Sequence, residues 1–308
     1  GKEEDEKVKY SLIVLGAVLV VGALYLVPYR WDVFEIRPQT EEVGSQVHVV
    51  FGGDMMFDRY IRTVMNTVGG DYLFSCIDQL LLPADLVVAN LEGPITGNQS
   101  VSVGTKDGDP GHYTFTFPLL TADLLYRHNV RVVNVGNNHM LDFSREGLLE
   151  TKTALDLAGV EYFGNPDLGE EDRVLRKDVR GVALSFVNWS DWNSDKTDHT
   201  VAQVRKEKEA GRVPIVFAHW GDEYALTPER TKILARQFVD AGAALVVGSH
   251  SHIEGEHELY KGVHIYYSLG NFIFDQYFTD AVRQGILLDV EFSTTSVDKV
   301  NRVPIALM

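Results

Sequence analysis

Side chains that can bind metal follow five apolar runs of this sequence, at the point where each run ends. They are Asp54, Glu92, Asn138, His219, and the pair His250 and His252. Carboxylate oxygens, amide oxygens and imidazole nitrogens are the ligands that Mn, Zn, Fe and Mg accept in proteins. The pattern predicts a site for one or two divalent cations.

Each of these residues also has a simpler explanation when it is taken alone. Asp54 follows a glycine, which is typical of a turn, and Glu92 could be solvated. His219 could be a core histidine with a satisfied ring. His250 and His252 are a stronger signal, because imidazoles two residues apart on an irregular segment can converge on one metal. The combination favours a metal site, since a simpler explanation must otherwise hold at five strand ends at once.

The apolar runs alternate with helical patterns, and this alternation predicts a layered α/β domain whose sheets are covered by helices. Strands are expected over residues 46–52, 85–90, 131–135, 182–188, 213–219, 243–248, 263–268 and 286–292. Helices are expected over residues 57–67, 71–82, 118–129, 144–158 and 228–241. The later strands follow one another with little helix between them, which indicates some antiparallel pairing. Open α/β sheets bind ligands at the carboxyl ends of their strands, where the polar residues lie.

The N-terminal region contains a long uncharged segment, residues 11–28. As a helix it would cross the hydrocarbon core of a bilayer, about 30 Å. We therefore expect a short cytoplasmic tail (1–10), a transmembrane anchor (11–29), a linker (30–45) and one large domain (46–308). A buried core helix or a cleaved signal peptide are the alternatives. The lysine and arginine bias across the segment is slight, and an extracytoplasmic domain on a single-pass anchor in the cell membrane is the preferred orientation.

Charge and cysteine content exclude several classes of function. The 308 residues include 44 acidic and 28 basic side chains, for a net charge of −16. A nucleic-acid partner is not expected, because phosphate-backbone binding requires a basic surface. Cys76 is the only cysteine, so an intrachain disulfide and a thiolate metal cluster are both excluded.

Six motifs together carry a resemblance to known proteins. They are GGDMMFDR (52–59), NLEGPIT (90–96), VGNNHMLDF (135–143), FAHWGDEY (217–224), GSHSHI (248–253) and YSLGNFIFDQ (267–276). Their order and spacing resemble the metallophosphoesterase superfamily. More closely, they are similar to bacterial capsule-synthesis proteins of the CapA/PgsA type, which are associated with poly-γ-glutamate. The resemblance covers about residues 46–280.

The resemblance implies a metallophosphoesterase-like layered sandwich, with two mixed sheets flanked by helices and one N-terminal transmembrane helix. It also implies a division of the ligands between two sites. Glu92 stands where the superfamily has its metal-bridging carboxylate. Asn138, His219 and His250 would complete one site, and Asp54 and His252 would serve the other.

Further residues receive roles from the same resemblance. His139 would protonate the leaving group as a general acid, with Asp142 orienting its imidazole. Arg59 would bind a substrate oxyanion in bidentate fashion, or it is simply an arginine on a helix surface. Asn271, in the last motif, would line the pocket.

One departure from the superfamily pattern bears on activity. The superfamily expects Asp-x-His after the first strand, and this sequence has Met56 where the histidine would stand. The site of Asp54 and His252 therefore lacks one imidazole. Two functions remain open: a metal-dependent hydrolase of phosphoesters or of an anionic polymer, and a non-catalytic accessory subunit. The accessory subunit would bind poly-γ-glutamate beside membrane-embedded synthase subunits.

Overall fold

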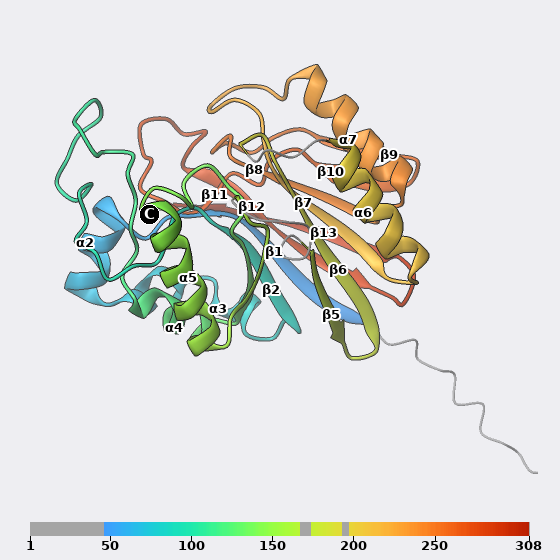
Figure 1. Ribbon diagram of the computed structural model, residues 1–308, viewed down its shortest axis with the longest axis horizontal. Coiled ribbons are helices and arrows are strands. Elements are labelled where there is room, and N and C mark those ends of the chain that lie inside the picture. Colours follow the sequence, from blue (N-terminus) through green and yellow to red (C-terminus); the bar gives the residue numbers. More distant parts are fainter. Residues whose placement is uncertain (1–45, 167–173, 193–196, 308) are drawn as a thin grey trace, which may run out of the picture. The chain divides into compact units, whose positions relative to one another are not determined.

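A computed structural model describes residues 46–166, 174–192 and 197–307 of the chain. Within these residues, two mixed β-sheets pack face to face, and each sheet carries helices on its outer face (Figure 1). The predicted layered α/β architecture with two mixed sheets is confirmed.

The first sheet has the strand order β13-β12-β1-β2-β3-β4, and β11 pairs with the end of β1. Its strands are β1 (Val47–Met55), β2 (Leu86–Leu91), β3 (Val130–Asn134), β4 (Glu161–Phe163), β11 (Asn271–Ile273), β12 (Gln284–Phe292) and β13 (Val297–Ala306). Strands β1 to β4 are parallel, whereas β12 runs antiparallel to both β1 and β13.

The second sheet has the order β5-β6-β7-β8-β10-β9. Its strands are β5 (Val174–Val179), β6 (Val182–Ser190), β7 (Val213–His219), β8 (Leu245–Ser249), β9 (His257–Tyr260) and β10 (Val263–Tyr266). The four central strands β6, β7, β8 and β10 are parallel, and β5 and β9 add antiparallel edges.

Helices cover the two outer faces. Those on the first sheet are α2 (Arg59–Val68), the 3₁₀ helix η1 (Gly70–Phe74), α3 (Asp78–Leu81), α4 (Leu120–Arg127) and α5 (Ser144–Ala158). Those on the second sheet are α6 (Thr197–Glu209) and α7 (Glu229–Ala241). Figure 1 shows the two groups of helices on opposite sides of the paired sheets.

The central strands are apolar on both faces because each sheet is covered on both sides. In β2, Leu86 and Val88 face the other sheet, while Val87 and Ala89 face the helices. Burial of a valine or leucine side chain contributes about 1.5–3 kcal/mol. The near-continuous apolar runs of the sequence follow from this arrangement.

The eight expected strands and four of the five expected helices are present, most of them with shifted ends. The prediction of one helix over 71–82 was wrong, because the chain turns at Ser75–Ile77 and divides that segment into η1 and α3. Strands β4, β5, β9, β11 and β13 and helix α6 were not predicted. Most of them are short or half-exposed, so their sequences lack a long apolar run.

In the described part of the chain, no helix combines the length and apolarity that crossing a membrane requires. The predicted anchor, residues 11–29, lies outside the described residues.

Candidate metal centre

The predicted ligands come from strand ends of both sheets. Asp54 lies near the end of β1, Glu92 directly follows β2, and His219 is the last residue of β7. His250 and His252 follow β8. Because the carboxyl ends of parallel strands meet at one edge of each sheet, packing the two sheets together brings all these residues to one place.

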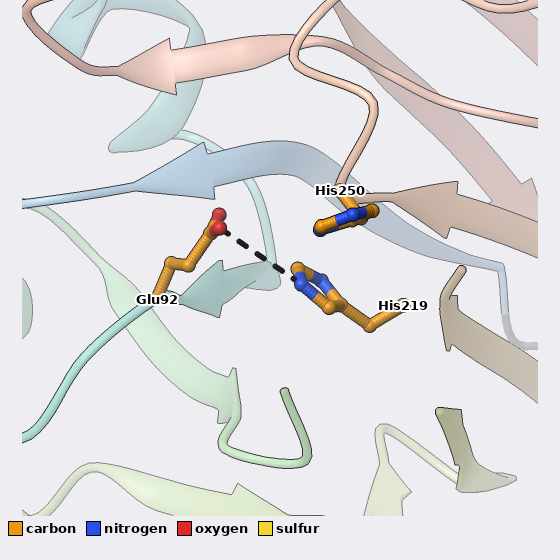
Figure 2. A group of neighbouring side chains, drawn as sticks. All are labelled: Glu92, His219 and His250. Carbon is orange, nitrogen blue, oxygen red and sulfur yellow. Dashed lines mark ion pairs between the residues drawn. The ribbon is translucent and has the colours of Figure 1, made fainter. Parts of the chain in front are cut away.

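Glu92 is shared by two groups of ligand atoms. One group is Glu92, His219 and His250, and the other is Asp54, Glu92 and His252. Within each group, the ligand atoms lie within 4.8 Å of one another. Figure 2 shows the first group, in which the Glu92 carboxylate points toward the His219 ring and the His250 ring lies beside it. The Glu92 Oε1 atom is 3.9 Å from Nε2 of His219 and 3.5 Å from Nε2 of His252.

Asn138, the sixth predicted ligand, also reaches this place. Its Oδ1 is 2.7 Å from Nε2 of His219. The structure therefore brings all six predicted ligands together, with Glu92 shared by the two groups. Their binding of a cation stays a prediction.

The two carboxylates are costly to ionise in the metal-free protein. Burial raises the pKa of Asp54 to about 6, although hydrogen bonds from the His250 backbone N–H and the Asn90 side chain oppose this shift. Burial, and then the charge of Asp54, raises the pKa of Glu92 well above its usual range. A divalent cation would offset this cost, because it favours the ionised form of both carboxylates.

The three imidazoles are neutral, which is the form that binds metal. Burial, followed by the charge of His139, lowers the pKa of His250 to about 4. Burial also lowers the pKa of His219 and His252 well below the usual range, and His250 adds to the effect in both cases.

Two atoms of the centre are buried without a hydrogen-bond partner among the described residues: Oε1 of Glu92 and Nδ1 of His250. Buried polar atoms are rarely left unpaired, because each costs about 1–3 kcal/mol. Carboxylate, amide and imidazole side chains that converge in this way fit a divalent cation.

The backbone at the centre adopts conformations that fit a crowded site. His250 and His252 have φ values of +94° and +57°, in the region that side chains other than glycine rarely occupy. Gly53 lies where a Cβ atom would come within 1.9 Å of the carbonyl oxygen of Gly270. Glycine at this position lets β1 and the segment before β11 approach closely.

His139 and Asp142 form the predicted pair. The Nδ1 atom of His139 is 2.9 Å from Oδ2 of Asp142. The same carboxylate oxygen accepts a hydrogen bond from the backbone N–H of Phe115 at 2.7 Å, and the Phe115 ring lies against the imidazole. Asp142 is thus held in place, and its contact with His139 uses Nδ1 and not Nε2.

Arg59 is buried, with 7% of its surface exposed, so the alternative of a surface arginine was wrong. Its Nη2 donates to Asp275, and its Nη1 is 3.2 Å from Nε2 of His112. The guanidinium carbon lies 5.1 Å from the centre of the Phe115 ring and 5.5 Å from the centre of the Phe274 ring. Its predicted contact with a substrate oxyanion stays a prediction.

Met56 points away from the centre. It is fully buried in the core between the first sheet and its helices, and its sulfur accepts a hydrogen bond from the backbone N–H of Asp58. The group of Asp54, Glu92 and His252 accordingly has one imidazole, whereas the group of His219 and His250 has two.

Several residues of the centre were not predicted from the sequence. Asn90 donates to Oδ1 of Asp54 at 2.8 Å, and its own oxygen accepts from Asn134, which in turn accepts from Asn188 of the second sheet. Ser249 contacts the His219 ring. Asn90 lies two residues before Glu92 in the same motif, and that proximity is the one signal that marked it.

The two-sheet sandwich and the carboxylate, amide and imidazole side chains at its strand ends define an α/β domain with a candidate two-cation centre. The family described as bacterial capsule synthesis protein PGA_cap matches residues 48–276. This match covers more than half of the chain, so the chain belongs to that family.

Curated relatives agree with this family. The PGA biosynthesis protein CapA of Bacillus subtilis (strain 168) is 26% identical over 326 residues, covering 99% of this chain and 82% of that protein. The capsule biosynthesis protein CapA of Bacillus anthracis is 27% identical over 300 residues, covering 90% and 71%. A probable polyglutamine synthesis accessory protein of Mycobacterium tuberculosis is 32% identical over 222 residues, covering 62% and 56%.

Proposed function

We propose that this chain takes part in poly-γ-glutamate capsule synthesis as a metal-dependent, hydrolase-like protein that acts on the polymer. The observation that carries the proposal is the position of Glu92, shared between two groups of buried ligand atoms. The names of the Bacillus relatives, PGA biosynthesis and capsule biosynthesis proteins, support poly-γ-glutamate as the polymer.

The residues that would hold the cations are Asp54, Glu92, Asn138, His219, His250 and His252. A divalent cation in such a site supplies Lewis-acid polarisation of a carbonyl or phosphoryl oxygen. Its identity among Mn, Zn, Fe and Mg is open, since all accept this donor set.

The remaining chemistry belongs to the protein's own side chains. His139 would give a proton from Nε2 to the leaving group, which for a γ-amide is the departing nitrogen. Asp142 holds the ring by its contact with Nδ1 and would stabilise the protonated imidazole. Such a general acid contributes about 10²–10⁴-fold to a rate.

The cellular context is part of the proposal. The uncharged segment 11–28 would anchor the chain in the cell membrane, with the large domain on the extracytoplasmic side where a capsule polymer emerges. Membrane-embedded synthase subunits would be its partners.

A non-catalytic accessory role is the second candidate. Met56 stands where the superfamily has a histidine, and its side chain is packed in the core, so one of the two groups has a single imidazole. The mycobacterial relatives carry the word accessory in their names. In this role a cation held by the same centre would bind the carboxylate groups of the polymer, and the polymer would not be cleaved.

Metal analysis combined with an activity assay distinguishes the two candidates. The full chain would be tested by elemental analysis, and then with poly-γ-glutamate and a generic phosphodiester, with and without Mn²⁺. Two metals per chain and metal-dependent turnover are expected for the hydrolase, and His139→Gln should keep the metal while losing turnover. One metal without turnover would favour the accessory role, and the absence of bound metal would refute both.

A further inference from the structure

We infer that Asn90 is a positioning residue, which holds the carboxylates of Asp54 and Glu92 in place through a chain of buried asparagine side chains. The chain runs from β2 of the first sheet to β6 of the second. The inference deepens the proposed metal centre and rests on it, but the effect of Asn90 on Asp54 can also be measured without metal.

The side-chain nitrogen of Asn90 contacts three of the six candidate ligands. It donates to Oδ1 of Asp54 at 2.8 Å, lies 3.4 Å from Oε2 of Glu92, and lies 3.3 Å from Nδ1 of His219. An amide NH₂ group has two hydrogens to donate and accepts none. Asn90 therefore acts on the ligands through this nitrogen, and the nitrogen is not itself a ligand.

Asn137 fixes which end of the Asn90 amide faces the ligands. The Nδ2 of Asn137 donates to the backbone oxygen of Leu91 at 2.8 Å, and its Oδ1 accepts from the backbone N–H of His139 at 3.2 Å. These backbone groups define the nitrogen and the oxygen of Asn137. The same nitrogen donates to Oδ1 of Asn90 at 3.1 Å, so the nitrogen of Asn90 must face the carboxylates.

Asn134 supports the same orientation and connects it to the second sheet. Its Nδ2 donates to Oδ1 of Asn90 at 2.9 Å, while its own Oδ1 accepts from the backbone N–H of Gly136 at 3.1 Å. That oxygen also accepts from Asn188 of β6 at 3.0 Å, and the Asn188 nitrogen donates to the backbone oxygen of Gly136 at 3.1 Å. Backbone groups thus define the polarity of each amide along the chain.

The backbone closes around these side chains. Asn90, Asn134, Asn137 and Asn188 each expose 1% of their surface or less. A Cβ atom on Gly136 would come within 2.2 Å of the Asn188 side-chain oxygen, and one on Gly164 would come within 2.8 Å of the Asn134 side-chain oxygen. Glycine at both positions leaves room for the amides, and the amides have little room to turn.

A fixed donor beside Asp54 and Glu92 has a clear physical use. Their ligand oxygens lie within 4.8 Å of each other in a buried site, and two carboxylates that share such a site repel each other. A donor between them offsets this repulsion and holds both groups facing the centre before a cation arrives. Residues that orient metal ligands typically contribute about 10–100-fold to metal affinity.

Calorimetric titration of the full chain with Zn²⁺ would test the inference, together with the visible absorption spectrum of the Co²⁺-loaded protein, which reports the geometry of the ligands. Asn90→Ala should bind Zn²⁺ about 10–100-fold more weakly than wild type and should change the Co²⁺ spectrum. Asn134→Ala should weaken binding by about 10-fold, the lower end of that range. Among the described residues, the hydrogen bonds of the Asn134 side chain reach no candidate ligand, so its effect must pass through Asn90.

Asn129→Ala is the matched control. Asn129 directly precedes β3, whereas Asn134 is the last residue of that strand. Its amide donates to the backbone oxygens of Leu81 and Ala84, both at 2.8 Å. The substitution should lower the urea midpoint of the metal-free protein and leave the Zn²⁺ affinity and the Co²⁺ spectrum unchanged. A loss of stability alone is thereby distinguished from a loss of positioning.

Wild-type affinity and an unchanged Co²⁺ spectrum in folded Asn90→Ala would overturn the inference. If Asn90→Ala does not fold, the same results in Asn134→Ala would overturn it. If the wild-type protein binds neither Zn²⁺ nor Co²⁺, the proposed metal centre fails, and urea denaturation in EDTA at pH 8 decides the positioning role. Asn90→Ala should then lower the midpoint less in an Asp54→Ala background than in wild type, and an equal shift in both would overturn the inference.

Discussion

Replacing Glu92 with glutamine is expected to stabilise the metal-free protein and to abolish its stabilisation by divalent cations. Glu92 is fully buried, its Oε1 has no partner among the described residues, and Asp54 lies beside it. Glutamine has nearly the same size and no charge. Its amide would face Nε2 of His252, which lies 3.5 Å from Oε1 of Glu92.

The size of the stabilisation can be worked out from Asp54, because the same burial acts on both carboxyl groups. The pKa of Asp54 rises from the ordinary 3.8 to about 6. At 1.36 kcal/mol for each pH unit of difference, ionising this carboxyl costs the fold about 3 kcal/mol. Glu92 receives fewer hydrogen bonds than Asp54, so we expect a gain of the same order when its charge is removed.

The gain should depend on pH in a defined direction. A carboxyl group whose pKa is raised on folding favours the folded state while it is protonated. Its contribution to stability is complete below its pKa in the unfolded chain, and it is lost as the pH rises through its pKa in the folded protein. Glutamine does not titrate. The advantage of Glu92→Gln should therefore be absent near pH 4 and grow toward pH 8.

Urea denaturation of the full chain in EDTA, at pH 5 and pH 8, would measure this effect. Glu209→Gln, the same change at an exposed position of α6, is the control and should be neutral. Added Mn²⁺ should raise the stability of wild type by about 2.7 kcal/mol at one hundred times the dissociation constant, and should leave Glu92→Gln unchanged. A metal-free Glu92→Gln protein that is less stable than wild type at pH 8 would refute the reasoning.

Three further predictions concern the site, the buried ion pair and the anchor. His219→Ala combined with His250→Ala should fold and lose bound metal, and unchanged metal content by elemental analysis would contradict the ligand assignment. Arg59→Met should lower the free energy of unfolding by about 3–5 kcal/mol, because Asp275 would stay buried without its charged partner; a loss below about 1 kcal/mol in urea denaturation would contradict that account. Deleting residues 1–30 should release the protein from the membrane fraction, and continued co-sedimentation with membranes would indicate another attachment.

The strands at the centre of the sheets were predictable because their burial on both faces requires continuous apolar runs. Elements outside these central strands were less predictable. Strand β13 alternates between half-buried and exposed residues, and the buried face of α6 includes Thr200, Gln203 and Glu207. A helix with a polar buried face has no apolar stripe, so the periodicity of its sequence does not reveal it.

The sequence by itself determined which side chains follow the central strands, since the end of an apolar run marks the end of a buried strand. On that basis it identified the six candidate ligands, whereas the roles of His139 and its partner Asp142 came from the resemblance of the motifs to known proteins. These inferences need only local information, because each residue is close in sequence to the strand that positions it.

Only the tertiary structure decided how those side chains are held. Arg59 and Asp275 pair across 216 residues, so no local pattern could distinguish a buried arginine from a surface one. Asn271 reaches His252 only because β11 pairs with the end of β1, and Asn188 reaches Asn134 only because the two sheets pack together. Burial and hydrogen bonding between distant segments depend on the packing of whole sheets, and that packing also shifts the pKa values of the centre.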